Sequence, residues 1–391
     1  MPSRTVLYVA VGGENSIAVY DLDARNGSLT KLGDTPCPAP FQLTTDPSNR
    51  YLYAVSMDAG NELHSFSINA ATGTLSHINT VPPADPGGFP APSADACAIA
   101  TDKTGKFLLT AHYSGGFVSA HSLGYNGAIS AQPVQCATTT TGCHSVKTGA
   151  SNTVAYAPCV AAGDQSAGEG NRIFQFSFDA TSGAPFTAPA GEVTPVDAVN
   201  TITDGKNQYG NRGEPGPRHI TFHPTASILY AVDEQGNTVT AYEVGPDGSL
   251  SHTQQLPTLP GADTPWSPNA HGADSATSEL SIDGSGRFMY AGNRHQQGHA
   301  EVRHSLGCFL VDATDGSVSS APPAILKHPA QSLCIDPAGG LVCSCGTEGE
   351  VGMVSVLKID RSTAGLETVA VHEMGATHAV WAIELPAAAA L

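Results

Sequence analysis

The sequence GPRHITFHP at 216–224, followed by YAVDE at 230–234, predicts a short strand, a turn, a second strand and a carboxylate at its end. Variants of this pattern recur, with an Asp-Pro, His-Pro or Asp-x-x-Gly turn leading into an apolar strand in most copies. The turn-and-strand segments lie at 46–55, 102–110, 149–157, 223–232, 283–291 and 336–343. The chain is therefore a repeat protein with a period of roughly fifty to sixty residues.

Most copies continue into an alternating strand and a Gly-centred turn, as at 238–242 and 247–250. Four strands per unit at this period predict the blades of an all-β, seven-bladed β-propeller. The strand at 7–10 lacks a preceding inner strand, and the strand at 379–384 lacks a following one, so we expect the two to share a blade and close the ring. We expect residues 1–391 to form a single domain with a long insertion at about 183–215.

The composition excludes several classes of function. A formal net charge of −18 and a pI near 5.1 argue against nucleic-acid binding, which needs a basic face. No run of roughly 18 apolar residues predicts a membrane span. Nine scattered cysteines in a chain without a signal-like start indicate reduced thiols and a cytoplasmic protein. Because a closed ring leaves no sheet edge to pair, we expect a monomer.

Charged residues gather at predicted strand ends that must meet. Successive strands of a blade are antiparallel, so the start of the first strand and the turn after the second lie on one face of the disc. Since the first strand lines the central channel, both positions crowd one mouth of it. The residues concerned are His112, His144, Arg218, His219, Glu234, Glu279 and Arg294. Side-chain alternation predicts that His219, next to Arg218, points away from the channel.

These residue types suit a small anionic substrate. Arginine presents fixed donors that pair with carboxylate or phosphate and can stabilise an oxyanion. Histidine and glutamate can move a proton. A G-x-S-x-G elbow, an H-E-x-x-H helix and a phosphate-binding G-x-x-x-x-G-K loop are all missing from the sequence. We therefore expect neither a metal nor a cofactor.

At these residues the chain resembles the seven-bladed lactonase family, which includes propeller-type 6-phosphogluconolactonases and carboxymuconate lactonizing enzymes. The motifs that carry the resemblance are GCHS (142–145), GPRH (216–219), FHP (222–224), the 230–234 strand end, RFMYAGNR (287–294) and NRIFQF (171–176). The resemblance implies a metal-independent site at one propeller mouth. It also implies that the family's His, Arg, Glu and Arg positions correspond to His144, Arg218, Glu234 and Arg294.

Three functions compete on this basis. The first is hydrolysis of a sugar lactone, most simply 6-phosphogluconolactone, with His144 or Glu234 as general base and the two arginines holding the anion; His112, His219 and Glu279 would bind substrate. The second is a carboxymuconate-type lactonizing cycloisomerase using the same residues. The third is a non-catalytic propeller that binds proteins on its rim, because fold alone does not determine function.

Overall fold

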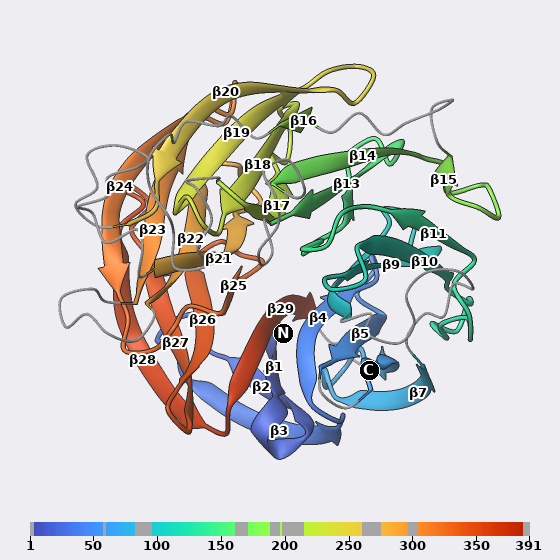
Figure 1. The fold of residues 1–391 in the computed structure, drawn as a ribbon. Helices are drawn as coiled ribbons and strands as arrows, with labels where there is room; N and C mark the ends of the chain where they lie inside the picture. The colour runs from blue at the N-terminus through green and yellow to red at the C-terminus, as the bar shows by residue number, and fades with distance from the viewer. Residues whose placement is uncertain are drawn as a thin grey trace.

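Seven antiparallel sheets surround a central axis in the computed structural model (Figure 1). The structure describes residues 4–57, 60–82, 96–160, 171–187, 196–197, 215–259, 275–295 and 304–385. Within these ranges the only helical element is a single 3-10 turn, Gly12–Glu14. No helix in the described part of the chain is long and apolar enough to cross a bilayer. The predicted seven-bladed β-propeller is confirmed.

The strands of each sheet run in order from the channel outward. The first four sheets are β29 (Thr377–Leu385), β1 (Arg4–Val11), β2 (Ser16–Leu22) and β3 (Leu29–Pro36); β4 (Pro40–Thr45), β5 (Tyr51–Ser56), β6 (Leu63–Ile68) and β7 (Leu75–Val81); β8 (Ala96–Thr101), β9 (Phe107–His112), β10 (Phe117–Ser122) and β11 (Gln135–Thr138); and β12 (Lys147–Thr148), β13 (Val154–Cys159), β14 (Arg172–Phe178) and β15 (Phe186–Thr187).

The remaining three sheets follow the same order. They are β17 (Pro217–Phe222), β18 (Ile228–Asp233), β19 (Thr238–Val244) and β20 (Leu250–Pro257); β21 (Ser275–Ile282), β22 (Phe288–His295), β23 (Ser305–Val311) and β24 (Val318–Ile325); and β25 (Ser332–Ile335), β26 (Leu341–Glu348), β27 (Val351–Ile359) and β28 (Leu366–Met374). Of the predicted insertion at about 183–215, residues 188–195 and 198–214 lie outside the described residues. Its segment β16 (Val196–Asp197) pairs with β14.

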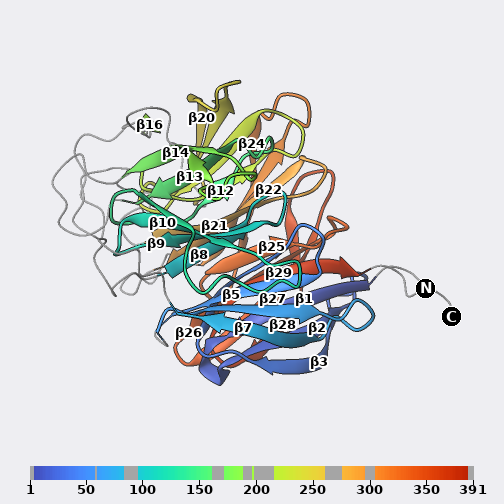
Figure 2. The same cartoon turned by 90° about the vertical axis from the view of Figure 1, so that its right-hand side faces the viewer.

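The two ends of the chain close the ring as predicted. Strand β1 pairs with β29 from Arg4 opposite Leu385 to Val11 opposite Thr377. Figure 2 shows red β29 beside blue β1 in this closing sheet. Because the first and last strands pair in one sheet, the two ends of the chain complete one blade and close the ring.

Most of the recurring turns share the same hydrogen bonds between one side chain and the backbone N–H groups of the turn. After the inner strand, Asp102 Oδ1 accepts the backbone N–H groups of Lys106 and Phe107, each at 2.8 Å. The aspartates at 46, 283 and 336 accept the corresponding pairs. In the sheet that begins with β17, His223 stands where the other sheets have the aspartate, and its Nδ1 accepts the Ala226 N–H at 2.8 Å. In five of the seven sheets, the Asp or His of the sequence repeat therefore holds the turn between the first strand and the second.

A buried tyrosine links several neighbouring blades. The second-strand hydroxyl donates to a backbone carbonyl in the outer turn of the following blade. The pairs are Tyr8 to Gly73 at 2.8 Å, Tyr156 to Gly248 at 2.9 Å, Tyr230 to Gly316 at 2.6 Å and Tyr290 to Ala364 at 3.2 Å. All four acceptors have positive φ, from 60° to 85°, so the bond holds a turn that few residue types adopt.

Five inner strands carry an extra residue near the same mouth of the channel. The pairing of each inner strand with its neighbour slips there by one residue. The slips fall at Phe41, Cys97, Arg218, Ser278–Glu279 and His378. A bulge bends the strand and changes the direction of its side chains. This is the feature of the fold that positions the site.

We expect Tyr230→Phe to lower the free energy of unfolding by about 1–2 kcal/mol, because it leaves the buried Gly316 carbonyl without its donor. Denaturant unfolding followed by circular dichroism measures this. Tyr125→Phe is the matched control, since Tyr125 is 94% exposed. Equal stability of the two variants would mean that the blade link contributes nothing.

Candidate functional site

A small hollow lies where the bulged strands meet at the channel mouth. It is lined by Phe41, Gln42, Cys97, His144, Arg218, His219, Glu279, Gln331, Ser332, His378 and Ala379. Its free space is about 10 Å³, which is room for roughly one water molecule. A sugar-sized substrate would therefore have to lie over the hollow, with only its reacting group reaching in.

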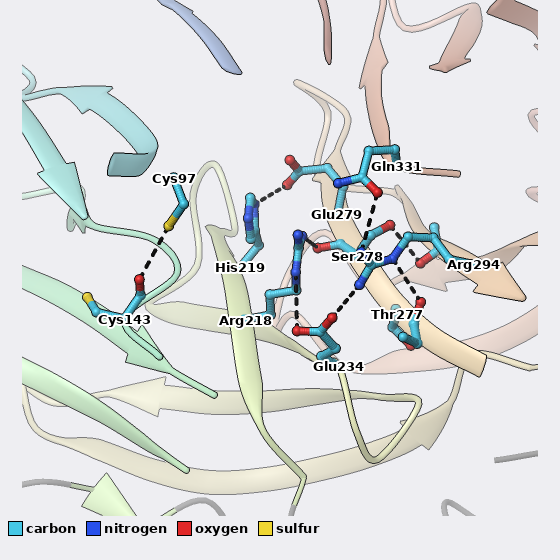
Figure 3. Close-up of polar contacts among 12 residues, drawn as sticks. Cys97, Cys143, Arg218, His219, Glu234, Thr277, Ser278, Glu279, Arg294 and Gln331 are labelled. Carbon is cyan, nitrogen blue, oxygen red and sulfur yellow. Dashed lines mark hydrogen bonds and ion pairs between the residues drawn. The ribbon is translucent and has the colours of Figure 1, made fainter. Parts of the chain in front are cut away.

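Glu234 lies between two guanidinium groups (Figure 3). Arg294 Nη2 donates to Glu234 Oε1, and Arg218 Nε lies 3.4 Å from Glu234 Oε2 in an ion pair. The side chains of Arg218 and Glu234 are only 4% and 10% exposed. Glu234 directly follows β18, and its backbone N–H donates to the Gly216 carbonyl at 2.8 Å. The three predicted residues are thus brought together, with two positive charges around one negative charge.

Backbone and amide oxygens hold the rest of both guanidinium groups. Arg218 Nη1 donates to the Ser278 carbonyl at 2.5 Å. Arg294 Nε donates to the Ala276 carbonyl at 3.4 Å, and its Nη1 to Gln331 Oε1 at 3.3 Å. Burial, and then the charge of Arg294, lower the pKa of Arg218 from its ordinary value. The pair carries an excess of positive charge that an anionic group can neutralise.

His219 and Glu279 form a second pair beside the arginines. His219 Nδ1 and Glu279 Oε1 are 2.9 Å apart, and the Leu280 N–H also donates to that oxygen at 3.0 Å. Burial acts to raise the pKa of Glu279, but the His219 ring, the charge of Lys147 and the backbone N–H outweigh it and lower that pKa to about 2. Burial lowers the pKa of His219, although the negative charge of Glu279 acts in the opposite direction and raises it.

The predicted orientation of His219 is wrong. Alternation from Arg218 would turn the His219 ring away from the channel, but the ring lines the hollow. The reason is the bulge between Pro217 and His219, which places two consecutive side chains on one side of the strand. Because Nδ1 of His219 is directed at the Glu279 carboxylate, the neutral ring carries its proton on Nδ1. Its Nε2 atom then keeps a lone pair that can accept a proton.

His144 faces His219 across the hollow. Their ring centroids are 5.3 Å apart, and the Tyr113 ring lies edge-on to His144 at 5.4 Å. The Nδ1 atom of His144 is buried and has no hydrogen-bond partner among the described residues. Burial, Arg218 and His219 lower the pKa of His144 well below its usual range, so the ring is neutral at physiological pH.

His112 is not brought to this hollow. Its ring is stacked on Phe117 of the neighbouring strand, with centroids 4.1 Å apart and an interplanar angle of 17°. Its Nε2 lies 2.9 Å from Ser119 Oγ. His112 is 1% exposed and packs within its own blade. Asp233, one residue before Glu234, is likewise turned into its blade, and burial raises its pKa to about 6.

Neutral residues of the hollow were missed by reasoning from charge. Gln331 accepts a hydrogen bond from Arg294, and Phe41 packs at 5.4 Å from the His378 ring. A positional signal could have found three of them, Phe41, Cys97 and Gln331, since the residue five places before each turn residue lies at this level of the inner strand. Counting back in this way gives Phe41, Cys97, His144, Arg218, Ser278 and Gln331.

Comparisons with known proteins give a consistent result. A family model described as Lactonase, 7-bladed beta-propeller, matches residues 1–89 and 87–382. A 6-phosphogluconolactonase of Pectobacterium carotovorum is 26% identical over 376 residues, covering 95% of this chain and 96% of the relative. One from Yersinia pestis is 26% identical over 379 residues, with 95% and 96% coverage.

Solved structures share the fold at lower identity. A Bacteroides uniformis protein has a TM-score of 0.77 at 20% identity, covering 98% of this chain and all of its own. A periplasmic gluconolactonase of Pseudomonas aeruginosa also has a TM-score of 0.77, at 18% identity, covering 98% of this chain and all of its own. At these identities the likeness concerns the propeller alone.

We expect Glu234→Gln to lower the free energy of unfolding by about 3 kcal/mol or more, because it leaves the buried Arg218 guanidinium without a counter-charge. Chemical denaturation at pH 7 measures the change. Glu243→Gln makes the same substitution at an exposed position on β19 and should cost less than about 0.5 kcal/mol. Similar losses in the two variants would show that the charge cluster does not stabilise the mouth.

Proposed function

Because the chain belongs to the lactonase family of seven-bladed β-propellers, we propose that it hydrolyses a sugar lactone, with 6-phosphogluconolactone as the leading substrate. The observation that supports this most directly is the mouth cluster, where two guanidinium groups share one carboxylate beside two neutral imidazoles. Such a cluster offers both anion binding and proton transfer, the two requirements of ester hydrolysis.

The arginines supply the electrostatic part. Arg294 is the more accessible of the two, with 18% of its side chain exposed against 4% for Arg218. We assign Arg294 to the anionic group of the substrate and Arg218 to the oxyanion that forms on the lactone carbonyl. Glu234 keeps both guanidinium groups in place. Because its two oxygens already face two guanidinium groups, we assign Glu234 an orienting role.

His219 is the better placed of the two histidines to act as general base. Glu279 holds its Nδ1 proton, which leaves Nε2 able to accept one from water. The water oxygen attacks the carbonyl carbon while its proton passes to His219 Nε2. The tetrahedral intermediate then collapses, the ring C–O bond breaks, and the imidazolium returns the proton to the departing ring oxygen. His144, 5.3 Å away between ring centroids, would position the water.

The central test is acid release from freshly prepared 6-phosphoglucono-δ-lactone in weak buffer, with spontaneous hydrolysis subtracted. We expect wild type to accelerate the reaction and Arg218→Ala to lose about 10²–10³-fold in kcat, the usual cost of one oxyanion donor. Arg287→Ala, at an exposed arginine, is the matched control and should keep full activity. If wild type matched the background, this substrate would be excluded, and unphosphorylated lactones and muconates would be tried next.

The role of Glu279 is tested by the pH profile of Glu279→Gln. The carboxylate raises the pKa of His219, so removing its charge lowers the pKa of the base. We expect the acidic limb of kcat/KM to move to lower pH and kcat to fall by about 10²-fold. Measurements between pH 4.5 and 7.5 avoid rapid spontaneous hydrolysis. An unchanged acidic limb with a folded variant would exclude His219 as the base.

A further inference from the structure

Below the hollow, the central channel widens into a larger cavity of about 490 Å³ that all seven inner strands line. This volume is in the range of small-ligand sites. One layer of its wall contains the residues that follow the bulge layer by three positions. They are Thr44, Ala100, Lys147, Thr221, Ser281, Cys334 and Trp381. The wall is thus rich in hydroxyl groups and has one ammonium group at this level.

From this wall we propose that the channel cavity is a binding site for a small phosphate-bearing anion, held by Lys147 and Lys103 with surrounding hydroxyl groups. The proposal concerns a second site, and it does not depend on the lactonase activity at the mouth. The two lysines belong to neighbouring blades, and both line the cavity. Desolvation, and then the charge of Lys147, lower the pKa of Lys103, so each of the two ammonium groups feels the charge of the other.

Several hydrogen-bond donors that line this cavity have protons that no described residue accepts. Lys147 Nζ donates to the Ile220 carbonyl at 2.8 Å, which uses one of its three protons. The side-chain hydroxyls of Thr44 and Ser281 make no hydrogen bond to any described residue. Hydroxyl and ammonium donors around one cavity match the several acceptor oxygens of a phosphate.

Nearby carboxylates are engaged elsewhere. Asp46 and Asp102 line the cavity, but each accepts backbone N–H groups and a hydroxyl within its own turn. Glu279 attracts Lys147, but its Oε1 accepts from His219 and the Leu280 N–H. The hydrogen bonds of these acidic groups therefore leave the lysine donors of the cavity unoccupied.

Trp381 provides a direct probe, because its ring lines the same cavity. Wild type is titrated with potassium phosphate at constant ionic strength, with potassium chloride as the reference, and tryptophan fluorescence is recorded. The signal of Trp381→Phe is subtracted to remove the contribution of Trp266. We expect a saturable change with phosphate, and a parallel rise in melting temperature. Methyl phosphate and 6-phosphogluconate as separate titrants distinguish free phosphate from a phosphate monoester.

Lysine variants decide the assignment. Lys147→Gln keeps a donor for the Ile220 carbonyl and should weaken phosphate binding at least tenfold, and Lys103→Gln should weaken it several-fold. Lys358→Gln removes the same charge from an exposed strand position and should leave binding unchanged. A non-saturable fluorescence response, or equal affinity in folded Lys147→Gln and Lys358→Gln, would overturn the proposal. Lactone hydrolysis is not measured in this experiment, so its outcome tests the phosphate site independently of the proposed lactonase activity at the mouth.

Discussion

The slip in register of the inner strands is the constraint on which the site depends. A regular strand shows every second side chain to the channel, so each blade could offer only one residue at a given level. Where an extra residue is inserted, two consecutive side chains reach the mouth, as Arg218 and His219 do. Bulges at the same level in five inner strands thereby concentrate side chains into a hollow that has room for about one water.

The charge arrangement follows from this crowding. Buried guanidinium groups need a counter-charge, and Glu234 at the end of β18 supplies it to two blades at once. The same burial keeps His144 and His219 neutral, because their pKa values are lowered. A site that keeps its cations charged and its imidazoles neutral can bind an anion and still accept a proton. Neither property would survive if the mouth were open to water at the level of Glu234.

Much of this could be predicted from the sequence. The Asp-x-x-Gly turns revealed the blade count because each aspartate clasps the start of the next strand, a local requirement visible in the residues themselves. The geometry of antiparallel strands also brought His144, Arg218 and Arg294 to one mouth. The orientation of His219 could not be predicted, because a bulge depends on the bending of the whole strand and leaves no signature in alternation. The sequence also could not show that His112 lies away from the hollow. Its position at a strand end predicted a place at the mouth, but its ring stacks on Phe117 within its own blade.

Glu279 connects the two parts of the channel. It lines both the hollow at the mouth and the larger cavity beneath it. On one side it accepts from His219, and on the other it attracts Lys147, whose charge helps to lower its pKa. An anion held at Lys147 would weaken that attraction, raise the pKa of Glu279 and so change how strongly it polarises His219. An anion bound at Lys147 would therefore be coupled to the base proposed at the mouth through a single carboxylate.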